Sequence, residues 1–361
     1  GAQSYTGAVT LSTDVTLTTT SNGNVTFGST VNSADATARD LTLSIGTGTA
    51  RFDGVVGGNY VLDVIGITGN LDLNANVLKT ADSSAGATSL SVSGTSDLGA
   101  NVKTTGAQSY TGAVTLSTDV TLTTTSNGNV TFGSSIGNTS AQSLTLNTGS
   151  GTVGVTGTVG SGVALNVLTL TQTGGATFSG SVNAATITLT DTTGTIAFNG
   201  SVTATTLNTA NKGYNLAFNG SANTITNAVT FINTGTVTLG NESTDSITFT
   251  GGITATAPSQ VNIAGTVQTS NQAIVLGDGD TPVVLTANTI ISGGTAGDIT
   301  LGGTVNGAAT LNLNTTGTTT LNGLIGNTVP LTSVTTNASG TVVINAAGIT
   351  TTGAQTYNDA V

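Results

Sequence analysis

The chain has 361 residues, of which 6% are charged, and it contains 51 glycines, three prolines and neither histidine nor cysteine. A net charge of −11 with five basic residues excludes the basic surface that nucleic-acid binding requires, and the missing cysteine excludes disulfides and thiolate metal sites. The hydrophobic fraction of 36% is unlike that of a disordered chain, and no long apolar run suggests a membrane span. We therefore expect a folded chain with a thin apolar core, no nucleic-acid partner and no membrane insertion.

A long phrase opens the chain and returns without a change. It reads GAQSYTGAVTLSTDVTLTTTSNGNVTFGS at Gly1–Ser29 and again at Gly106–Ser134, and GAQTYNDAV at Gly353–Val361 is a partial third copy. Exact internal repetition on this scale is typical of solenoids and other repeat proteins. We interpret residues 1–361 as a single continuous solenoid segment of a longer repetitive protein.

A shorter phrase recurs along the whole chain. In this phrase a bulky apolar residue is followed four positions later by Val, Ile or Ala with glycine between them, as in Phe178-Ser-Gly-Ser-Val182 and Phe198-Asn-Gly-Ser-Val202. The phrases that begin at Phe178, Phe198 and Phe218 follow one another at a constant interval. We expect the bulky residues to point inward and to stack into a column. The predicted core comprises Phe27, Phe52, Phe132, Phe178, Val182, Phe198, Val202, Phe218, Phe249, Leu301 and Leu321.

Short alternating segments lie between these phrases. Runs such as VTLTTT, TITLT and TVTLG place an apolar residue at every second position, which predicts strands with one buried face. Turn-forming sequences such as SNGN and DTTG separate the runs, and no segment has helical spacing. A unit of this size cannot bury its own apolar face, so the chain must coil and stack successive turns. We predict an all-β fold, a right-handed parallel β-helix (β-solenoid) with about 20–23 residues per turn and essentially no helix.

A string of antiparallel sandwich domains is the alternative β architecture. The offset of the two exact copies, from Gly1 to Gly106, matches the size of such a domain, about 100 residues. The shorter phrase nevertheless continues through both copies without a linker, which favours the solenoid.

Two glycine-rich segments resemble ligand-binding motifs. Asp278 and Asp280 lie two positions apart in the turn GDGDTP, and carboxylates in such turns bind calcium. The unit occurs once, whereas calcium-binding repeats need it in succession, so a solvated turn is the preferred interpretation and calcium the alternative. The glycines of Gly149–Gly154 fit a dinucleotide-binding pattern, but a strand follows them where that motif needs a helix.

The chain offers few residues for catalysis. Its acids are scattered, and Asp14 and Asp119 occupy equivalent points of the two exact copies, which indicates repetition rather than a unique site. Without histidine and with five basic residues, acid–base chemistry has few participants. We predict that the chain is not an enzyme and has no cofactor, and the alternative of a β-helical polysaccharide lyase would require clustered Asp and Lys.

Tyrosine and threonine supply the remaining candidate binding surfaces. Tyr5, Tyr110 and Tyr357 share one position of the repeated phrase, where a packing role is preferred over sugar binding. Thr-x-Thr pairs such as Thr121/Thr123 recur in many strands, which suits a polysaccharide- or ice-binding outer face. Threonine is also the polar residue that strands favour, so the pairs have a purely structural explanation as well.

The segments TTGAQSYTGAVTL and NGNVTFGSTV resemble the repeat regions of filamentous-haemagglutinin-like adhesins and related giant bacterial surface proteins. The resemblance implies a right-handed parallel β-helix that is exported across an outer membrane and forms a rod or fibre for adhesion, aggregation or biofilm. It implies an extracellular or cell-surface location on a Gram-negative-type bacterium. The expected partners are the chain itself, by end-to-end stacking or continuation into a fibre, and glycans of host or neighbouring-cell surfaces.

Overall fold

The computed structural model describes all 361 residues, which form strands and turns without a helix. The fold is a parallel β-solenoid of about 16 turns, so the predicted all-β parallel β-helix is confirmed. The chain divides into two compact units, Gly1–Ala184 and Ala185–Val361. No helix is present that could cross a membrane. The right hand and the continuity of residues 1–361 as one solenoid stay predictions.

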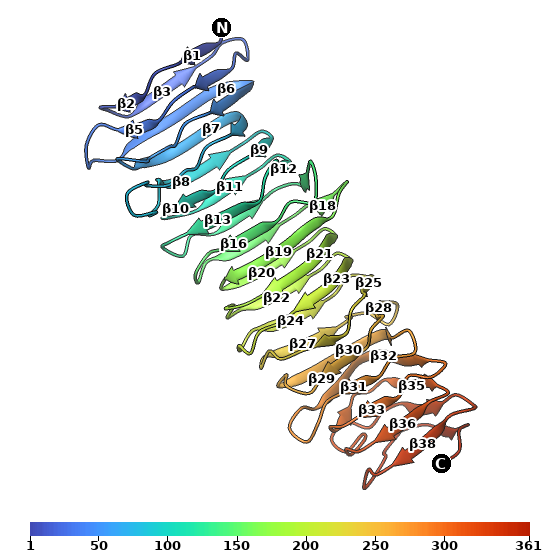
Figure 1. Ribbon diagram of the computed structural model, residues 1–361. Coiled ribbons are helices and arrows are strands. Elements are labelled where there is room, and N and C mark those ends of the chain that lie inside the picture. The colour runs from blue at the N-terminus through green and yellow to red at the C-terminus, as the bar shows by residue number, and fades with distance from the viewer. The chain divides into compact units, whose positions relative to one another are not determined.

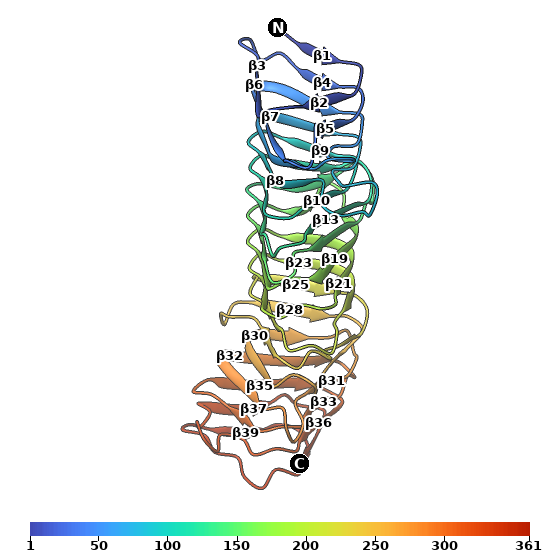
Figure 2. The same cartoon turned by 90° about the vertical axis from the view of Figure 1, so that its left-hand side faces the viewer.

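The first unit winds around three faces, which we call A, B and C in the order in which the chain meets them (Figure 1). Each strand pairs in parallel with the strand one turn later on the same face, as the vertical series β3, β6, β7 and β8 shows in Figure 2. Face A holds β1 (Gln3–Tyr5), β4 (Val25–Phe27), the ends of β6 (Arg39–Phe52) and β7 (Leu62–Leu73), β9 (Ser96–Leu98), β12 (Val114–Leu116), β15 (Ile136–Asn138), β18 (Val159–Ser161) and the start of β21 (Val182–Leu189). Face B holds β2 (Val9–Leu11), β5 (Val31–Ser33), the bridge residues Val56 and Val77, β10 (Val102–Thr104), β13 (Val120–Thr124), β16 (Leu144–Asn147) and β19 (Leu165–Gln172). Face C holds β3 (Val15–Thr18), the starts of β6 and β7, β8 (Ala87–Val92), β11 (Gln108–Tyr110), β14 (Val130–Phe132), β17 (Thr152–Val155) and β20 (Gly175–Phe178).

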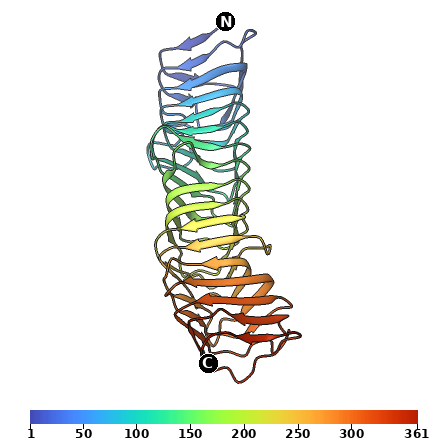
Figure 3. The same ribbon diagram turned by 90° about the vertical axis from the view of Figure 1, so that its right-hand side faces the viewer.

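The second unit also has three faces of parallel strands, which we call D, E and F (Figure 3). Face D holds β22 (Thr195–Phe198), β24 (Asn215–Phe218), β27 (Thr236–Leu239), the starts of β30 (Gln260–Gln268) and β32 (Val283–Gly294), and β34 (Val305–Asn306). Face E holds β23 (Val202–Asn208), β25 (Ala222–Ile225), β28 (Ser246–Phe249), the ends of β30 and β32, β35 (Thr310–Thr315), β37 (Ser333–Thr336) and β39 (Gln355–Tyr357). Face F holds β26 (Val229–Thr230), β29 (Ile253–Ala255), β31 (Ile274–Leu276), β33 (Ile299–Leu301), β36 (Thr318–Leu321) and β38 (Thr341–Ile344).

The length of a turn varies more widely than the sequence predicts. Val92 pairs with Tyr110 in a turn shorter than the predicted range, whereas Leu17 pairs with Leu43 in a turn longer than that range. The longer turn contains a loop after β5, in which Asp35 Oδ1 accepts a hydrogen bond of 2.8 Å from the backbone N–H of Thr37. Loops at the corners therefore absorb the difference in length while the strands keep their pairing.

The shorter repeated phrase forms the corner between two faces. Phe178 ends a strand of face C and Val182 begins one of face A, and both side chains are buried. A Cβ at the intervening Gly180 would lie 2.5 Å from the backbone of Gly157 in the turn before. At this corner residue 180 therefore needs to be glycine, because the previous turn approaches it too closely for a side chain.

Apolar side chains stack along the inside of both units. The rings of Tyr5 and Phe27 lie 5.3 Å apart, those of Phe27 and Phe52 4.9 Å apart, and those of Phe198 and Phe218 5.3 Å apart. Every residue that the sequence placed in the core is at most 2% exposed. These residues are Phe27, Phe52, Phe132, Phe178, Val182, Phe198, Val202, Phe218, Phe249, Leu301 and Leu321.

Polar side chains close the corners and link each turn to its neighbour. Thr124 is buried, and its hydroxyl donates a hydrogen bond of 2.6 Å to the carbonyl of Gly128. Asn127 has a positive φ of 61°, and its Oδ1 accepts from the backbone N–H of Ser150 in the next turn at 2.9 Å. Such bonds satisfy backbone groups at corners, where strand pairing stops.

Candidate functional site

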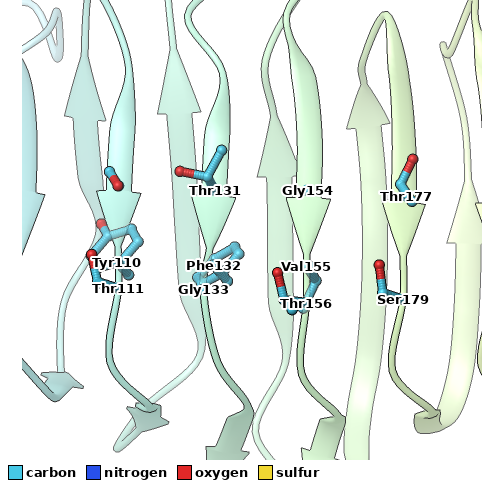
Figure 4. A pocket seen from close by; sticks show the side chains of 11 residues that line it. Tyr110, Thr111, Thr131, Phe132, Gly133, Gly154, Val155, Thr156, Thr177 and Ser179 are labelled. Atoms are coloured by element: carbon cyan, nitrogen blue, oxygen red, sulfur yellow. The ribbon is translucent and has the colours of Figure 1, made fainter.

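A shallow groove of about 250 Å³ lies on face C (Figure 4). It crosses four successive strands, β11, β14, β17 and β20. Its lining residues are Ser109, Tyr110, Thr111, Thr131, Phe132, Gly133, Gly154, Val155, Thr156, Thr177 and Ser179.

Alternation along the strands gives the groove two outward rows. Tyr110, Phe132, Val155 and Phe178 occupy one register position and point into the core, and all four are buried. The positions on either side of them therefore point outward. The row before them is Ser109, Thr131, Gly154 and Thr177, and the row after them is Thr111, Gly133, Thr156 and Ser179 (Figure 4).

Glycine makes the hollow. A Cβ built on Gly154 would meet nothing closer than the Cγ2 of Thr131 at 4.0 Å, so the space above this residue is open. At Gly133 in the other row a Cβ would lie 2.8 Å from the carbonyl oxygen of Thr111, so the turns approach closely there and leave no room for a side chain. The two glycines expose backbone between flanking hydroxyl groups.

The groove is neutral and carries free hydroxyl groups. Thr131 Oγ1 donates a hydrogen bond of 3.5 Å to the backbone carbonyl of Gln108. The other hydroxyls of the two rows have no hydrogen-bond partner in the protein. They belong to Ser109, Thr111, Thr156, Thr177 and Ser179. No lining residue is charged at neutral pH, so the groove offers hydroxyl groups and exposed backbone to a ligand.

Tyr110 lies beneath the groove and does not reach it with its hydroxyl. The side chain is fully buried, and its hydroxyl donates a hydrogen bond of 3.2 Å to Gln108 Oε1. Burial raises the pKa of the Tyr110 phenol far above its usual value. The same bond joins Tyr5 to Gln3 at 3.0 Å.

The partial third copy repeats this contact, since the Tyr357 hydroxyl donates to Gln355 Oε1 at 3.2 Å. All three tyrosines therefore make one repeated structural contact, and Tyr110 contributes no hydroxyl to the groove.

The equivalent surface on face A is charged, and it has a hollow of its own of about 280 Å³, whose lining includes Asp72 and Asp97. There the column Tyr5, Phe27, Phe52 and Leu73 takes the place of the column beneath the groove. Arg51 stands where Gly154 stands on face C. Its guanidinium forms ion pairs of 2.8 Å with Asp53 and 3.4 Å with Asp72. Two related surfaces of one molecule have thus diverged into an ion-pair cluster and a neutral groove.

The calcium candidates lie in the turn between β31 and β32. Asp278 Oδ1 accepts hydrogen bonds of 3.0 Å from the backbone N–H groups of both Asp280 and Thr281. Asp280 is exposed, and the structure contains no group of three or more Asp, Glu, His or Cys side chains arranged to hold a metal ion. The Asp278 carboxylate therefore has a structural role in closing this turn.

The other residues singled out from the sequence have structural contacts. Asp14 Oδ1 accepts from the backbone N–H of Asp40 at 3.0 Å, and Asp119 Oδ1 accepts from that of Ser143 at 2.8 Å. Both carboxylates therefore bind a backbone N–H group of the next turn of the solenoid. The glycine pattern at Gly149–Gly154 forms a corner and β17, and no helix follows it.

Sequence reasoning did not find the groove, because its rows join residues from successive turns whose faces the sequence does not specify. The one sequence signal for the groove is that Gly154 stands at the position that Arg51 occupies in the related segment. Comparison of the chain with protein-family models, curated proteins and solved structures finds no match.

Proposed function

We propose that this chain is an extracellular structural and adhesive repeat segment, a rod or fibre on the surface of a Gram-negative-type bacterium, without enzymatic activity. The observation that carries the proposal is the parallel stacking of successive turns in both units. In a solenoid each turn contacts only its neighbours, so repetition adds length without altering a site. The resemblance to filamentous-haemagglutinin-like repeats supports the location and the adhesive role.

The proposed partners follow from the same features. The chain partners itself, by end-to-end stacking or by continuation into a fibre, and it contacts glycans of host or neighbouring cells. Low charge and the absence of cysteine suit export in an unfolded state.

Surface labelling tests the location, and bead aggregation tests adhesion. Antibodies raised against the purified chain should label intact cells of the bacterium that carries it, and beads coated with the chain should aggregate or bind those cells. Labelling only after the cells are opened would refute the surface location. Coated beads that behave like albumin-coated beads would refute adhesion. Electron microscopy of the concentrated chain should show fibres with a layer spacing of about 4.8 Å along their axis.

A second candidate function is binding of a neutral polysaccharide, and the groove on face C favours it. Free hydroxyls of the two rows stand on or beside β11, β17 and β20, in a face whose neighbouring strands lie about 4.8 Å apart, which is a suitable surface for a polymer that is itself rich in hydroxyl groups. The absence of charge in the groove favours a neutral polymer over an acidic one. Ice binding has less support, because glycine interrupts the outward row of face C at Gly66 and Gly154.

A pair of arginine variants tests the groove. Gly154→Arg fills the hollow, whereas Gly66→Arg adds the same charge to the same outward row outside it. A Cβ at Gly66 also meets no atom closer than 4.0 Å, so the two variants place similar demands on the fold. Polysaccharide affinity measured by calorimetry or affinity electrophoresis should fall at least about tenfold in Gly154→Arg and stay unchanged in Gly66→Arg, a difference of about 1.4 kcal/mol. Equal behaviour of the two variants would exclude the groove, and thermal hysteresis of the native chain would favour ice.

A further inference from the structure

The two exact copies of the opening phrase lie on different faces of the first unit. In Gly1–Ser29 the strands β1, β2, β3 and β4 follow faces A, B, C and A. In Gly106–Ser134 the strands β11, β12, β13 and β14 follow faces C, A, B and C. The same sequence thus begins two faces further round the solenoid in its second copy.

The contacts inside the phrase survive this change of face. The rings of Tyr110 and Phe132 lie 5.3 Å apart at 15°, as those of Tyr5 and Phe27 lie 5.3 Å apart at 12°. The buried hydroxyl of Thr124 bonds the carbonyl four residues later, as that of its counterpart Thr19 does.

The glutamine side chain of the phrase also keeps its contact. Gln108 Nε2 donates to the carbonyl of Thr123 at 2.9 Å, and Gln3 Nε2 donates to that of Thr18 at 3.0 Å. The phrase therefore carries its own packing and hydrogen bonds and is independent of the face on which it begins.

The shift extends beyond the exact copy. Leu41-Thr-Leu43 on face C corresponds to Leu144-Thr-Leu146 on face B, two faces further on. Val77 on face B corresponds in the same way to Val182 on face A. Divergence of the sequence has not changed this relation, so the three faces are equivalent sites for strands of this pattern.

We propose that Gly1–Thr105 is an extension block, which lengthens the solenoid when it is repeated and turns each following block by two faces. The block spans four full turns and two faces of a fifth, so a whole number of turns is not required. The solenoid can then be lengthened by one short strand and one corner at a time, and not only by whole turns. This proposal goes beyond the surface role and holds whether or not that role is correct.

The chain already contains the contacts that connect one such block to the next. At the end of the block Val102 O and Thr104 Oγ1 accept hydrogen bonds of 3.3 and 3.1 Å from Gln108 Nε2, across the boundary between Thr105 and Gly106. A second block placed before Gly1 recreates this local sequence exactly. Gln3 then gains the same two acceptors.

A chain with residues 1–105 placed twice before residue 106 tests the proposal. The denaturant m-value scales with the surface that unfolding exposes, so it should rise about 1.3-fold, with a matching gain in β-sheet circular dichroism per molecule. The matched control inserts a block of the same composition with its strand residues scrambled. A duplicated block that protease removes like the scrambled one would overturn the proposal.

A shortened chain guards against failure of the longer one to fold. Gly106–Val361 begins with the same phrase, and it should unfold cooperatively with an m-value about 0.7-fold that of the full chain. If Gly106–Val361 and the duplicated block were both unfolded, the proposal that the phrase can begin on any face would be refuted.

Cysteine cross-linking tests the turn by two faces. Ser91 pairs with Ser109 on face C, and in the duplicated chain Ser91 of the inserted block should pair with Ser4 of the next. Cysteines at these two positions should cross-link, because neighbouring strands place Cα atoms within disulfide range. Cysteines at Asp97 of the inserted block and at Ser4 should not. Cross-linking of the second pair alone would show that the block keeps its face and would overturn the proposal.

Discussion

Thr319 is the clearest place where one substitution should stabilise the protein. Its side chain is fully buried on β36, its hydroxyl has no hydrogen-bond partner, and its register neighbours are Ile299 and Val342. A buried hydroxyl without a partner costs about 1–3 kcal/mol, and valine has nearly the same shape without the hydroxyl. Thr319→Val should therefore raise the free energy of unfolding by about 1–3 kcal/mol.

Thr315 supplies the matched control four residues earlier. It is equally buried, but its hydroxyl donates to the carbonyl of Gly297 at 2.6 Å and accepts from the backbone N–H of Gly317 at 2.9 Å. Thr315→Val leaves both groups without this partner and should lower the free energy of unfolding by about 1–3 kcal/mol. Urea unfolding followed by circular dichroism should show midpoints that move in opposite directions with an unchanged m-value. A lower midpoint in Thr319→Val would refute the reasoning, because it would mean that the hydroxyl has a favourable contact.

Four further substitutions test the packing and the buried phenol. Phe218→Ala empties a fully buried position of the ring column and should lower the free energy of unfolding by about 3–5 kcal/mol in urea titrations. Gly180→Ala should cost about 1–3 kcal/mol because the methyl group meets the previous turn, whereas Gly66→Ala should be nearly neutral in the same assay. Burial raises the pKa of Tyr110 above that of the unfolded chain, about 10, so the native state retains this proton longer. The buried phenol therefore contributes its full stabilisation below pH 10 and loses it as the pH rises above 10. The fall in urea midpoint between pH 9 and 11 should be smaller in Tyr110→Phe than in the unsubstituted chain. An equal fall in both would exclude the Tyr110 phenol as its cause.

The sequence predicts the fold well because the fold is built from local patterns. Alternation in runs such as Thr186–Thr190 marks the strands, and the phrase from Phe178 to Val182 marks a corner. Both signals depend on residues only a few positions apart. The spread of turn lengths was not predictable, since it depends on corner loops such as the one after β5 that leave the strand pattern unchanged.

The groove and the change of face were harder to foresee for a shared reason. A repeated phrase gives the order of its strands, but the face on which it begins depends on how many corners precede it. Gly154 marks a hollow only once its neighbours on the adjacent turns, Thr131 and Thr177, are known. The ion pairs of Arg51 likewise join residues from adjacent turns.

The two-face shift between the copies has a consequence for the direction in which the surface points. One position of the block, which Arg51 occupies first and Gly154 second, lies on face A the first time and on face C the second. A third block would present it on face B, and a fourth would return it to face A. A filament of such blocks would display the same position on all three faces in turn, so it could meet a flat surface or another filament with any of its faces.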